Sequence, residues 1–327
     1  MKTAAWPRDQ TEAERLLVVD PKSGALADFA VGDLPALLSP GDLLVVNDAA
    51  TLPGSLQGEA PGGAPIEVRL IGPAAHGTWT AAVLGAGNWR WRTEDRPAPP
   101  ALAPGSTLVF GASLRATVIE VSPVSPRLVR LAFDREGDAL WSAVYRSGHP
   151  VQYSYVRAPL ALWHVQTAYA SRPWAAEPPS AGRPLTWRVL LEARRRGVGL
   201  AAVTHAAGLS STGEAALDAA LPLPERYDIP GDTVAAVART RANGRRVMAV
   251  GTTVVRALEG AAENGGGRLL AGEGETALRL TREFRPRVVD GLLTGVHQPG
   301  ESHFDLLQAF APEALLRRAL AHAEEAG

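Results

Sequence analysis

The chain beyond its first 150 residues alternates between short apolar runs and amphipathic segments, and this alternation constrains the fold more than any other feature. Residues 187–197 have the apolar spacing of a helix, with Thr186 as a candidate N-cap, and residues 199–205 resemble a buried strand. The strand-like run 245–251 follows a second helical segment, for which Asp232 is the candidate cap. Because strands that alternate with helices favour parallel βαβ units, this region predicts an α/β fold.

The pattern differs between about residues 53 and 135, where short β-like runs are separated by glycine and proline turns. The runs are 65–72, 77–85, 106–111, 114–122 and 126–133. Such close spacing is typical of a small antiparallel barrel or sandwich. Two apolar runs before this region, 16–20 and 43–47, are predicted to be short buried strands. We therefore predict an α/β main domain, residues 1–52 plus 150–327, interrupted by an inserted β-barrel domain, residues 53–149.

The composition disfavours several classes of protein. The chain has no cysteine, which excludes disulfides and thiolate chemistry. Its net charge of −1 gives no overall basic footprint of the kind that nucleic-acid binders carry. No apolar run reaches the roughly 18 residues of a membrane span, and the N-terminus turns polar too early for a signal peptide. The histidines are scattered without a metal-ligand motif. We expect a cytoplasmic protein with no membrane partner and no metal.

The clearest candidate for a binding turn is Gly251-Thr252-Thr253, which lies between a strand-like run and a helix-like run. Such a turn can offer backbone N–H groups and hydroxyls to an anion. Arg256 follows one helical turn later and could neutralise that anion. The alternative is a structural helix cap with a surface ion pair between Arg256 and Glu259.

Eight segments, which span nearly the whole chain, carry a resemblance to a known family. They are RLLVVD (15–20), LLSPGDLLVVND (37–48), HVQTAYA (164–170), PPSAG (178–182), GVGLAAVTH (197–205), PERYDIP (224–230), RRVMAVGTTVVRALEG (245–260) and VVDGLLTGVHQP (288–299). In this order they resemble the S-adenosylmethionine:tRNA ribosyltransferase-isomerases of queuosine biosynthesis. Those proteins are transferases that modify tRNA. The resemblance implies a barrel-like α/β main domain interrupted by a β-barrel domain, in agreement with the pattern above.

The resemblance also implies a reaction. The ribosyl part of S-adenosylmethionine is transferred to the aminomethyl group of a 7-deazaguanine in tRNA and rearranges, and adenine and methionine are released. S-adenosylmethionine is then a substrate, and no metal or redox cofactor is expected. Most of the catalysis would come from orientation and electrostatics, because the sulfonium already acidifies the neighbouring C5′ hydrogens.

The matched segments contain the candidate site residues. The candidate catalytic residues are His297, Asp290 and Tyr169, and the candidate S-adenosylmethionine-binding residues are Gly251, Thr252, Thr253, Arg256, Gln166, Thr167, Ser180, Ala181, Gly182, Glu225 and Tyr227. A histidine is a plausible base or acid near neutral pH, but a loop hydrogen bond would also explain His297. Asp290 could orient a ligand or satisfy a turn. Thr167 and Tyr169 would share a face if they lie on a strand.

The chain departs from the family pattern at basic and histidine positions. Ala50 and Ser55 stand where the family has arginines, and Pro184, Ala206 and Leu223 stand where it has histidines. Fewer arginines weaken phosphate contacts, so tRNA is a partner expected with reduced basic contacts. Two alternatives therefore stay open: a divergent enzyme that joins S-adenosylmethionine to a small-molecule acceptor, and a non-catalytic nucleoside-binding protein.

Overall fold

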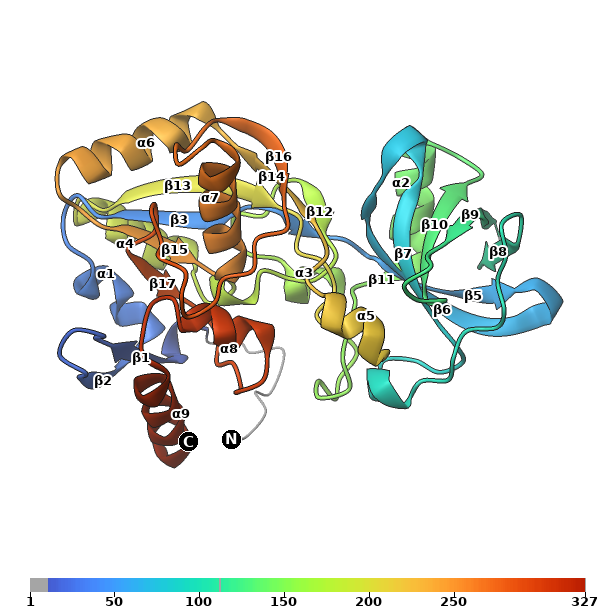
Figure 1. Ribbon diagram of the computed structural model, residues 1–327, viewed down its shortest axis with the longest axis horizontal. Coiled ribbons are helices and arrows are strands. Elements are labelled where there is room, and N and C mark those ends of the chain that lie inside the picture. The colour runs from blue at the N-terminus through green and yellow to red at the C-terminus, as the bar shows by residue number, and fades with distance from the viewer. Residues whose placement is uncertain (1–10, 112, 327) are drawn as a thin grey trace.

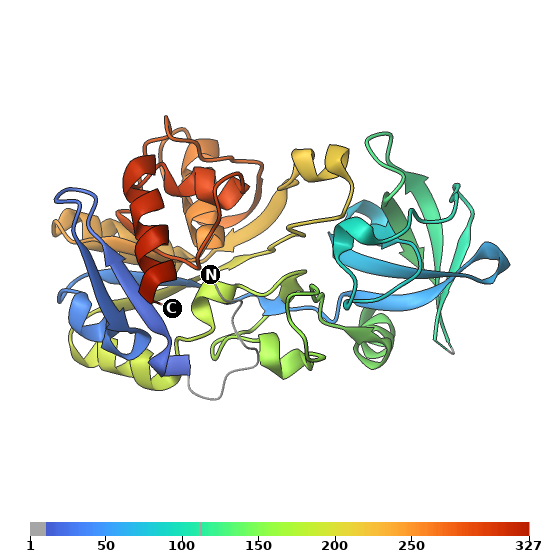
Figure 2. The ribbon, with the colours of Figure 1, turned by 90° about the horizontal axis from the view of Figure 1, so that it is seen from below.

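The computed structural model describes residues 11–111 and 113–326, which form two parts that lie side by side (Figures 1 and 2). The first part is built on a six-stranded mixed sheet and the second on an antiparallel barrel. The sheet order is β16 (Gly272–Thr276), β14 (Glu225–Ile229), β13 (Gly199–His205), β3 (Leu43–Asn47), β15 (Val247–Val250) and β17 (Gly291–Leu293). The four strands from β13 to β17 are parallel, whereas β14 runs antiparallel to both of its neighbours.

Helices cover both faces of this sheet, as alternation along the fully buried strand β3 requires. Leu43 and Val45 pack in one core with α6 (Gly231–Ala242) and α7 (Thr252–Asn264). Leu44 and Val46 pack in a second core with α1 (Leu34–Leu37) and α4 (Trp187–Arg195). The crossovers therefore place α6 and α7 on one side of the sheet and α1 and α4 on the other, as Figure 1 shows. Among the described strands, β16 and β17 are the sheet edges and do not pair with each other.

The barrel strands lie between Ser55 and Phe133. Their order is β5 (Ser55–Ala60), β6 (Ala64–Pro73), β7 (Trp79–Leu84), β10 (Leu128–Phe133), β9 (Leu114–Val121) and β8 (Thr107–Phe110), and β8 pairs with β5 to close the barrel. Helix α2 (Gly137–Ser147) packs its buried side chains against this core, and β11 (Gly148–His149) adds to β5. The predicted fold class, an α/β part with an antiparallel β-barrel, is confirmed. The precise domain boundaries stay a prediction.

Short elements complete the chain. They are β1 (Arg15–Val19), β2 (Leu26–Ala30), β4 (Ala50–Thr51), α3 (Leu162–Val165), β12 (Pro173–Ala175), α5 (Ala215–Ala220), α8 (Ser302–Leu307) and α9 (Glu313–Ala326). The two parts of the molecule touch closely where Arg127 Nη1 of the barrel donates to the Thr212 carbonyl at 2.8 Å. A side chain at Gly213 would overlap the backbone oxygen of Thr93, so a glycine is required there. No helix within the described ranges combines the length and apolar character needed to span a membrane.

Three local predictions differ from the structure. The strand β1 is not buried, because it pairs only with β2 in a two-stranded sheet at the surface. Pro230 occupies the N-cap of α6, and Asp232 lies inside its first turn instead of capping it. Thr167 and Tyr169 lie in an irregular segment after α3, not on a strand. By contrast, the Thr186 hydroxyl does accept from the Val189 N–H at the start of α4, as predicted.

Candidate functional site

The glycine turn joins the carboxyl end of β15 to the first residue of α7. Gly251 has φ +91°, a conformation that favours glycine, and no side chain caps the helix that begins at Thr252. A Cβ atom at Gly251 would lie 3.7 Å from Cβ of Ala181 and 3.5 Å from Oγ1 of Thr253. The turn therefore brings the predicted segments 251–253 and 180–182 together, with the positive end of the α7 dipole beside them.

Asn47, at the carboxyl end of the neighbouring strand β3, supports this turn. Its Nδ2 donates to Thr253 Oγ1 at 3.3 Å and to the His205 carbonyl at 3.0 Å. Its Oδ1 accepts from the backbone N–H groups of Ala49 and His205 at 3.0 and 2.9 Å. Sequence spacing gave no indication of this role, because the contact depends on β3 lying between β13 and β15 in the sheet.

Thr167, Tyr169 and Gly182 form the next layer of the site. A side chain at Gly182 would overlap Tyr169 Oη and would approach Thr167 Cγ2 at 3.3 Å, so a larger residue here would displace the Tyr169 hydroxyl. Thr167 Oγ1 and Tyr169 Oη are buried and have no hydrogen-bond partner. Burial, reinforced by the nearby Asp48 carboxylate, raises the pKa of Tyr169 well above its ordinary value. The hydroxyl therefore stays protonated near neutral pH and can donate to a ligand.

A buried ion pair involves Arg256, which lies on helix α7. Arg256 forms an ion pair with Glu225 through Nη1 and donates to the Leu278 carbonyl at 3.1 Å through Nε, whereas its buried Nη2 has no partner. Glu225 Oε1 accepts from the Gly208 N–H at 2.7 Å. Burial raises the pKa of Glu225 even though the Arg256 charge opposes the shift.

His205 adds a neutral ring to this group. Its Nε2 lies 3.4 Å from Glu225 Oε2, but neither ring nitrogen makes a hydrogen bond, although the side chain is fully buried. Burial and the Arg256 charge lower the pKa of His205 well below its ordinary value. The alternative prediction, a surface ion pair between Arg256 and Glu259, is wrong. Glu259 instead accepts from the consecutive backbone N–H groups of residues 287–289.

His297 lies in a histidine pair close to this group. Its ring stacks on His303 with centroids 4.8 Å apart, and its Nε2 is 2.9 Å from Thr294 Oγ1. Burial, together with His303, lowers the pKa of His297 to about 4, so the ring is neutral at pH 7. The Arg256 charge helps to lower the pKa of His303, so Arg256 lies within electrostatic range of this pair.

Four other predicted residues have different surroundings. Gln166 bonds both backbone groups of Thr51 at 2.9 Å and so holds a loop in place. The Tyr227 hydroxyl accepts from Asn264 at 3.2 Å, and its ring packs in the core under α7. Asp290 accepts from the Val247 N–H at 2.8 Å, at the end of β15 opposite Gly251. Ser180 is exposed in a short 3₁₀ turn next to Ala181.

Asn47, His205 and His303 were not among the predicted residues. For His205 the available signal was its position at the end of a strand, one place before Ala206, where the family pattern has a histidine. Within residues 11–111 and 113–326, no group of three or more histidine and carboxylate side chains could hold a metal ion.

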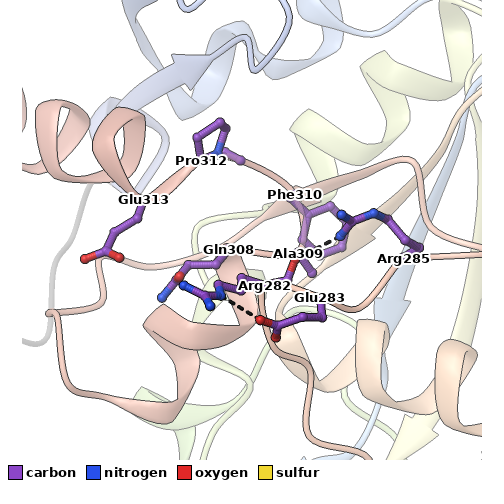
Figure 3. A pocket seen from close by; sticks show the side chains of 9 residues that line it. Arg282, Glu283, Arg285, Gln308, Ala309, Phe310, Pro312 and Glu313 are labelled. Atoms are coloured by element: carbon purple, nitrogen blue, oxygen red, sulfur yellow. Dashed lines mark hydrogen bonds and ion pairs between the residues drawn. The ribbon is translucent and has the colours of Figure 1, made fainter.

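A surface pocket of about 620 Å³ lies elsewhere, near the start of α9 (Figure 3). Arg282 on its rim pairs with Glu283 at 2.6 Å, and Arg285 donates to the Arg282 carbonyl at 2.8 Å. None of the predicted site residues lines it. Since its charged groups are exposed and already paired, this pocket offers less to a ligand than the glycine turn does.

Comparisons with known proteins show the family to which the chain is related. The family model described as "Queuosine biosynthesis protein" matches residues 1–327. An S-adenosylmethionine:tRNA ribosyltransferase-isomerase of Anaeromyxobacter sp. (strain Fw109-5) is 39% identical over 311 residues, which cover 93% of this chain and 84% of that protein. One from Acidiphilium cryptum is 35% identical over 98% of this chain and 91% of its own length. The crystal structure of an S-adenosylmethionine tRNA ribosyltransferase from Thermotoga maritima superposes with a TM-score of 0.51 at 25% identity, covering 99% of this chain and 92% of that one.

Proposed function

Because this chain belongs to the family of queuosine biosynthesis proteins, we propose that it is an S-adenosylmethionine:tRNA ribosyltransferase-isomerase. It transfers the ribosyl part of S-adenosylmethionine to the aminomethyl group of a 7-deazaguanine in tRNA, with release of adenine and methionine. Since tRNA is the acceptor, we place the protein in the cytoplasm. The reaction needs no metal or redox cofactor, because the sulfonium supplies the activation.

One observation carries this proposal. Buried polar atoms without a partner occur at Thr167, Tyr169 and Arg256, three of the site residues predicted from the sequence. An unsatisfied buried polar group costs about 1–3 kcal/mol, so several of them close to one glycine turn indicate a site whose partners come from a ligand. S-adenosylmethionine offers carboxylate, ribose and purine atoms that can satisfy them.

We assign the following roles in binding and catalysis. The N-terminus of α7 and the free Nη2 of Arg256 attract the negatively charged and oxygen-rich parts of the ligand. The protonated Tyr169 hydroxyl donates a hydrogen bond to the substrate, where it can stabilise the departing adenine. His297, neutral at pH 7, is our candidate to accept the C5′ proton that the sulfonium acidifies. Its lowered pKa makes it a weak base in the ligand-free protein, and Glu301, 3.7 Å from its Nδ1, would stabilise the positive charge that forms. We leave Asp290 out of this scheme, because its carboxylate joins β17 to β15 away from the turn.

The alternatives from the sequence are not favoured. Relatives at 35–39% identity over nearly the whole chain are tRNA ribosyltransferase-isomerases, which supports tRNA over a small-molecule acceptor and an enzyme over a silent binding protein. The absence of an arginine at residue 55 is explained locally, since Ser55 is buried and donates to Glu67 at 2.8 Å. A buried position of this kind is not a phosphate contact in this chain.

The test is incubation of the protein with S-adenosylmethionine, with and without tRNA that carries the aminomethyl deazaguanine. Mass spectrometry follows adenine, methionine and the mass of the modified nucleoside. We expect adenine and methionine in equal amounts, only in the presence of that tRNA. Adenine release that is independent of tRNA would support the small-molecule alternative, and binding without turnover would support the silent protein.

A further inference from the structure

Glu177 is a carboxylate near the site that the scheme above does not use. It lies between β12 and the turn that contains Gly182. Its Oε1 accepts three hydrogen bonds, from the Ser210 N–H at 2.7 Å, from Ser210 Oγ at 3.1 Å and from the Tyr153 hydroxyl. Three donors on one oxygen fix the orientation of the carboxylate.

The other oxygen, Oε2, is bound by no hydrogen bond or ion pair in the described part of the chain. Glu177 keeps partial solvent exposure, and Oε2 is not one of the buried polar atoms left without a partner. The oxygen is therefore fixed in direction and open to an incoming group.

The electrostatic surroundings of Glu177 favour a positive charge at Oε2. The Glu177 charge contributes to the raised pKa of Glu225, so the two carboxylates are close enough to repel each other. Burial raises the pKa of Glu177 itself. The charge of Arg69 in the barrel acts to lower the pKa of Glu177, but burial outweighs it, and the hydrogen bonds of Arg69 go to Glu67 and Thr93 and not to Glu177. A cation bound at Oε2 would relieve this repulsion.

The geometry also restricts the kind of cation. A guanidinium or the donor edge of a nucleobase binds a carboxylate through both oxygens, whereas Oε1 is already occupied by three donors. A primary ammonium is a point charge with rotatable N–H groups, and it can bind through one oxygen.

We propose that Glu177 Oε2 is the binding point for the primary ammonium group of a substrate. This inference rests on the proposed function, because both substrates of that reaction carry such a group. One source is the methionyl ammonium of S-adenosylmethionine, and the other is the aminomethyl group of the acceptor base. Both present the same chemistry to the carboxylate, and the test below separates them.

The test compares the full-length wild type with Glu177→Gln, which keeps the size of the side chain and removes its charge. Calorimetry measures the affinity for S-adenosylmethionine and for 5′-methylthioadenosine, a thioether that lacks the methionyl ammonium and carboxylate and the sulfonium charge. Steady-state kinetics measures KM for the tRNA acceptor. If Glu177 holds the methionyl ammonium, affinity for S-adenosylmethionine falls by about 10-fold or more while that for methylthioadenosine is unchanged. If it holds the acceptor, KM for tRNA rises by a similar factor and both affinities are retained.

Two further variants keep the inference falsifiable. Tyr153→Phe removes one donor to Oε1 but leaves the Glu177 charge, so it should change the same parameter in the same direction by a smaller factor. Glu263→Gln changes an exposed carboxylate on α7 and should behave as wild type. A folded Glu177→Gln protein with unchanged affinity and unchanged KM, in a wild type that turns over, overturns this inference and leaves the proposed function intact. A wild type that binds neither nucleoside and releases no adenine overturns both.

Discussion

Two buried glutamates, one in each part of the molecule, are paired with arginine and nevertheless behave differently. In the barrel, Glu67 accepts from Ser55 and Arg69 at 2.8 Å and from Arg96 at 2.5 Å, and none of the buried polar atoms of these residues lacks a partner. Burial alone would raise the pKa of Glu67, but the arginines lower it below its ordinary value. In the α/β part, Arg256 and the unbonded ring of His205 both approach Oε2 of Glu225, and the pKa of Glu225 is raised.

This difference in hydrogen bonding and pKa separates a structural ionic network from one that can bind a ligand. A network that satisfies all its members holds a fold together, and the Glu67 network joins strand β6 to the loop that carries Arg96. In a network with unbonded donors, those donors have lost their hydrogen bonds to water, which costs free energy, and a ligand that bonds to them can recover it. We therefore assign structure to the Glu67 network and substrate binding to the Glu225 network.

The largest expected effect is on stability, at the barrel network. Glu67→Gln leaves two buried arginine charges without a counter-charge, so the free energy of unfolding should fall by about 3–5 kcal/mol. Urea denaturation measures this change. The adenine release rate per folded molecule should stay much closer to wild type than that of Arg256→Gln, because Glu67 itself contacts none of the proposed substrate-binding residues and the network reaches the site only through Arg69, which lies 5.2 Å from the Tyr153 ring centroid. A large loss of turnover in folded Glu67→Gln would end the distinction between the two networks.

A second expectation concerns pH and His297, whose pKa is about 4 in the folded protein and has an ordinary value of 6.5. Between these values the unfolded chain binds a proton that the folded chain does not, so stability is complete above pH 6.5 and falls as the pH drops toward 4. The contribution of His297 amounts to about 3 kcal/mol over this window. Urea denaturation of His297→Gln at pH 7 and pH 4 should show a pH dependence that is smaller by this amount. An identical pH dependence in the two proteins would contradict the buried neutral histidine.

Arg256→Gln is expected to lower the rate of adenine release by about 100-fold, because it removes a charged donor aimed at the ligand. Stability falls as well, since Glu225 loses its counter-charge, although the raised pKa of Glu225 limits the loss because the carboxyl can take up a proton. The rate is therefore measured at a temperature where circular dichroism shows the variant to be folded. Wild-type turnover in that folded variant would refute the assignment of Arg256 to the site.

The smallest expected effect is the change in the free energy of unfolding of Tyr169→Phe, and its sign is informative. The Tyr169 hydroxyl is buried without a partner, so Tyr169→Phe should leave the ligand-free protein equally stable or more stable by up to about 1 kcal/mol, while adenine release falls. The matched change Tyr153→Phe removes a hydroxyl that donates to Glu177, so it should destabilise by about 1 kcal/mol. Denaturation of both variants without ligand gives the comparison. Equal losses of stability would mean that the Tyr169 hydroxyl has a partner in solution.

Much of the fold follows from local patterns. The strand β13 begins and ends at the predicted residues, and α7 begins at Thr252 as the pattern predicts, because apolar periodicity and glycine punctuation are both strong there. The strand β5 was missed, since SLQGEA contains a glycine, and it needs one: a Cβ at Gly58 would overlap the Val109 backbone of β8. Helix α2 was missed because its buried residues are few and tertiary packing on the barrel stabilises it.

The site was less accessible to sequence reasoning. Gly251, Arg256 and Glu225 come together because β14 and β15 belong to one sheet. The local pattern selected Gly251 and Arg256, whereas only the family resemblance selected Glu225. Asn47 and His205 depend on the strand order around β3, which no local pattern encodes. Asp290 was predicted from its neighbours in VVDG. It precedes β17, whereas Gly251 follows the parallel strand β15, so the two residues lie at opposite ends of the strands.

The most direct test is a crystal structure of the protein with S-adenosylmethionine bound. We expect ligand atoms within hydrogen-bonding distance of Arg256 Nη2, Thr167 Oγ1 and Tyr169 Oη, beside the N-terminus of α7. A ligand bound elsewhere, for example in the pocket lined by Arg282 and Arg285, with those three atoms still unbonded, would contradict the account.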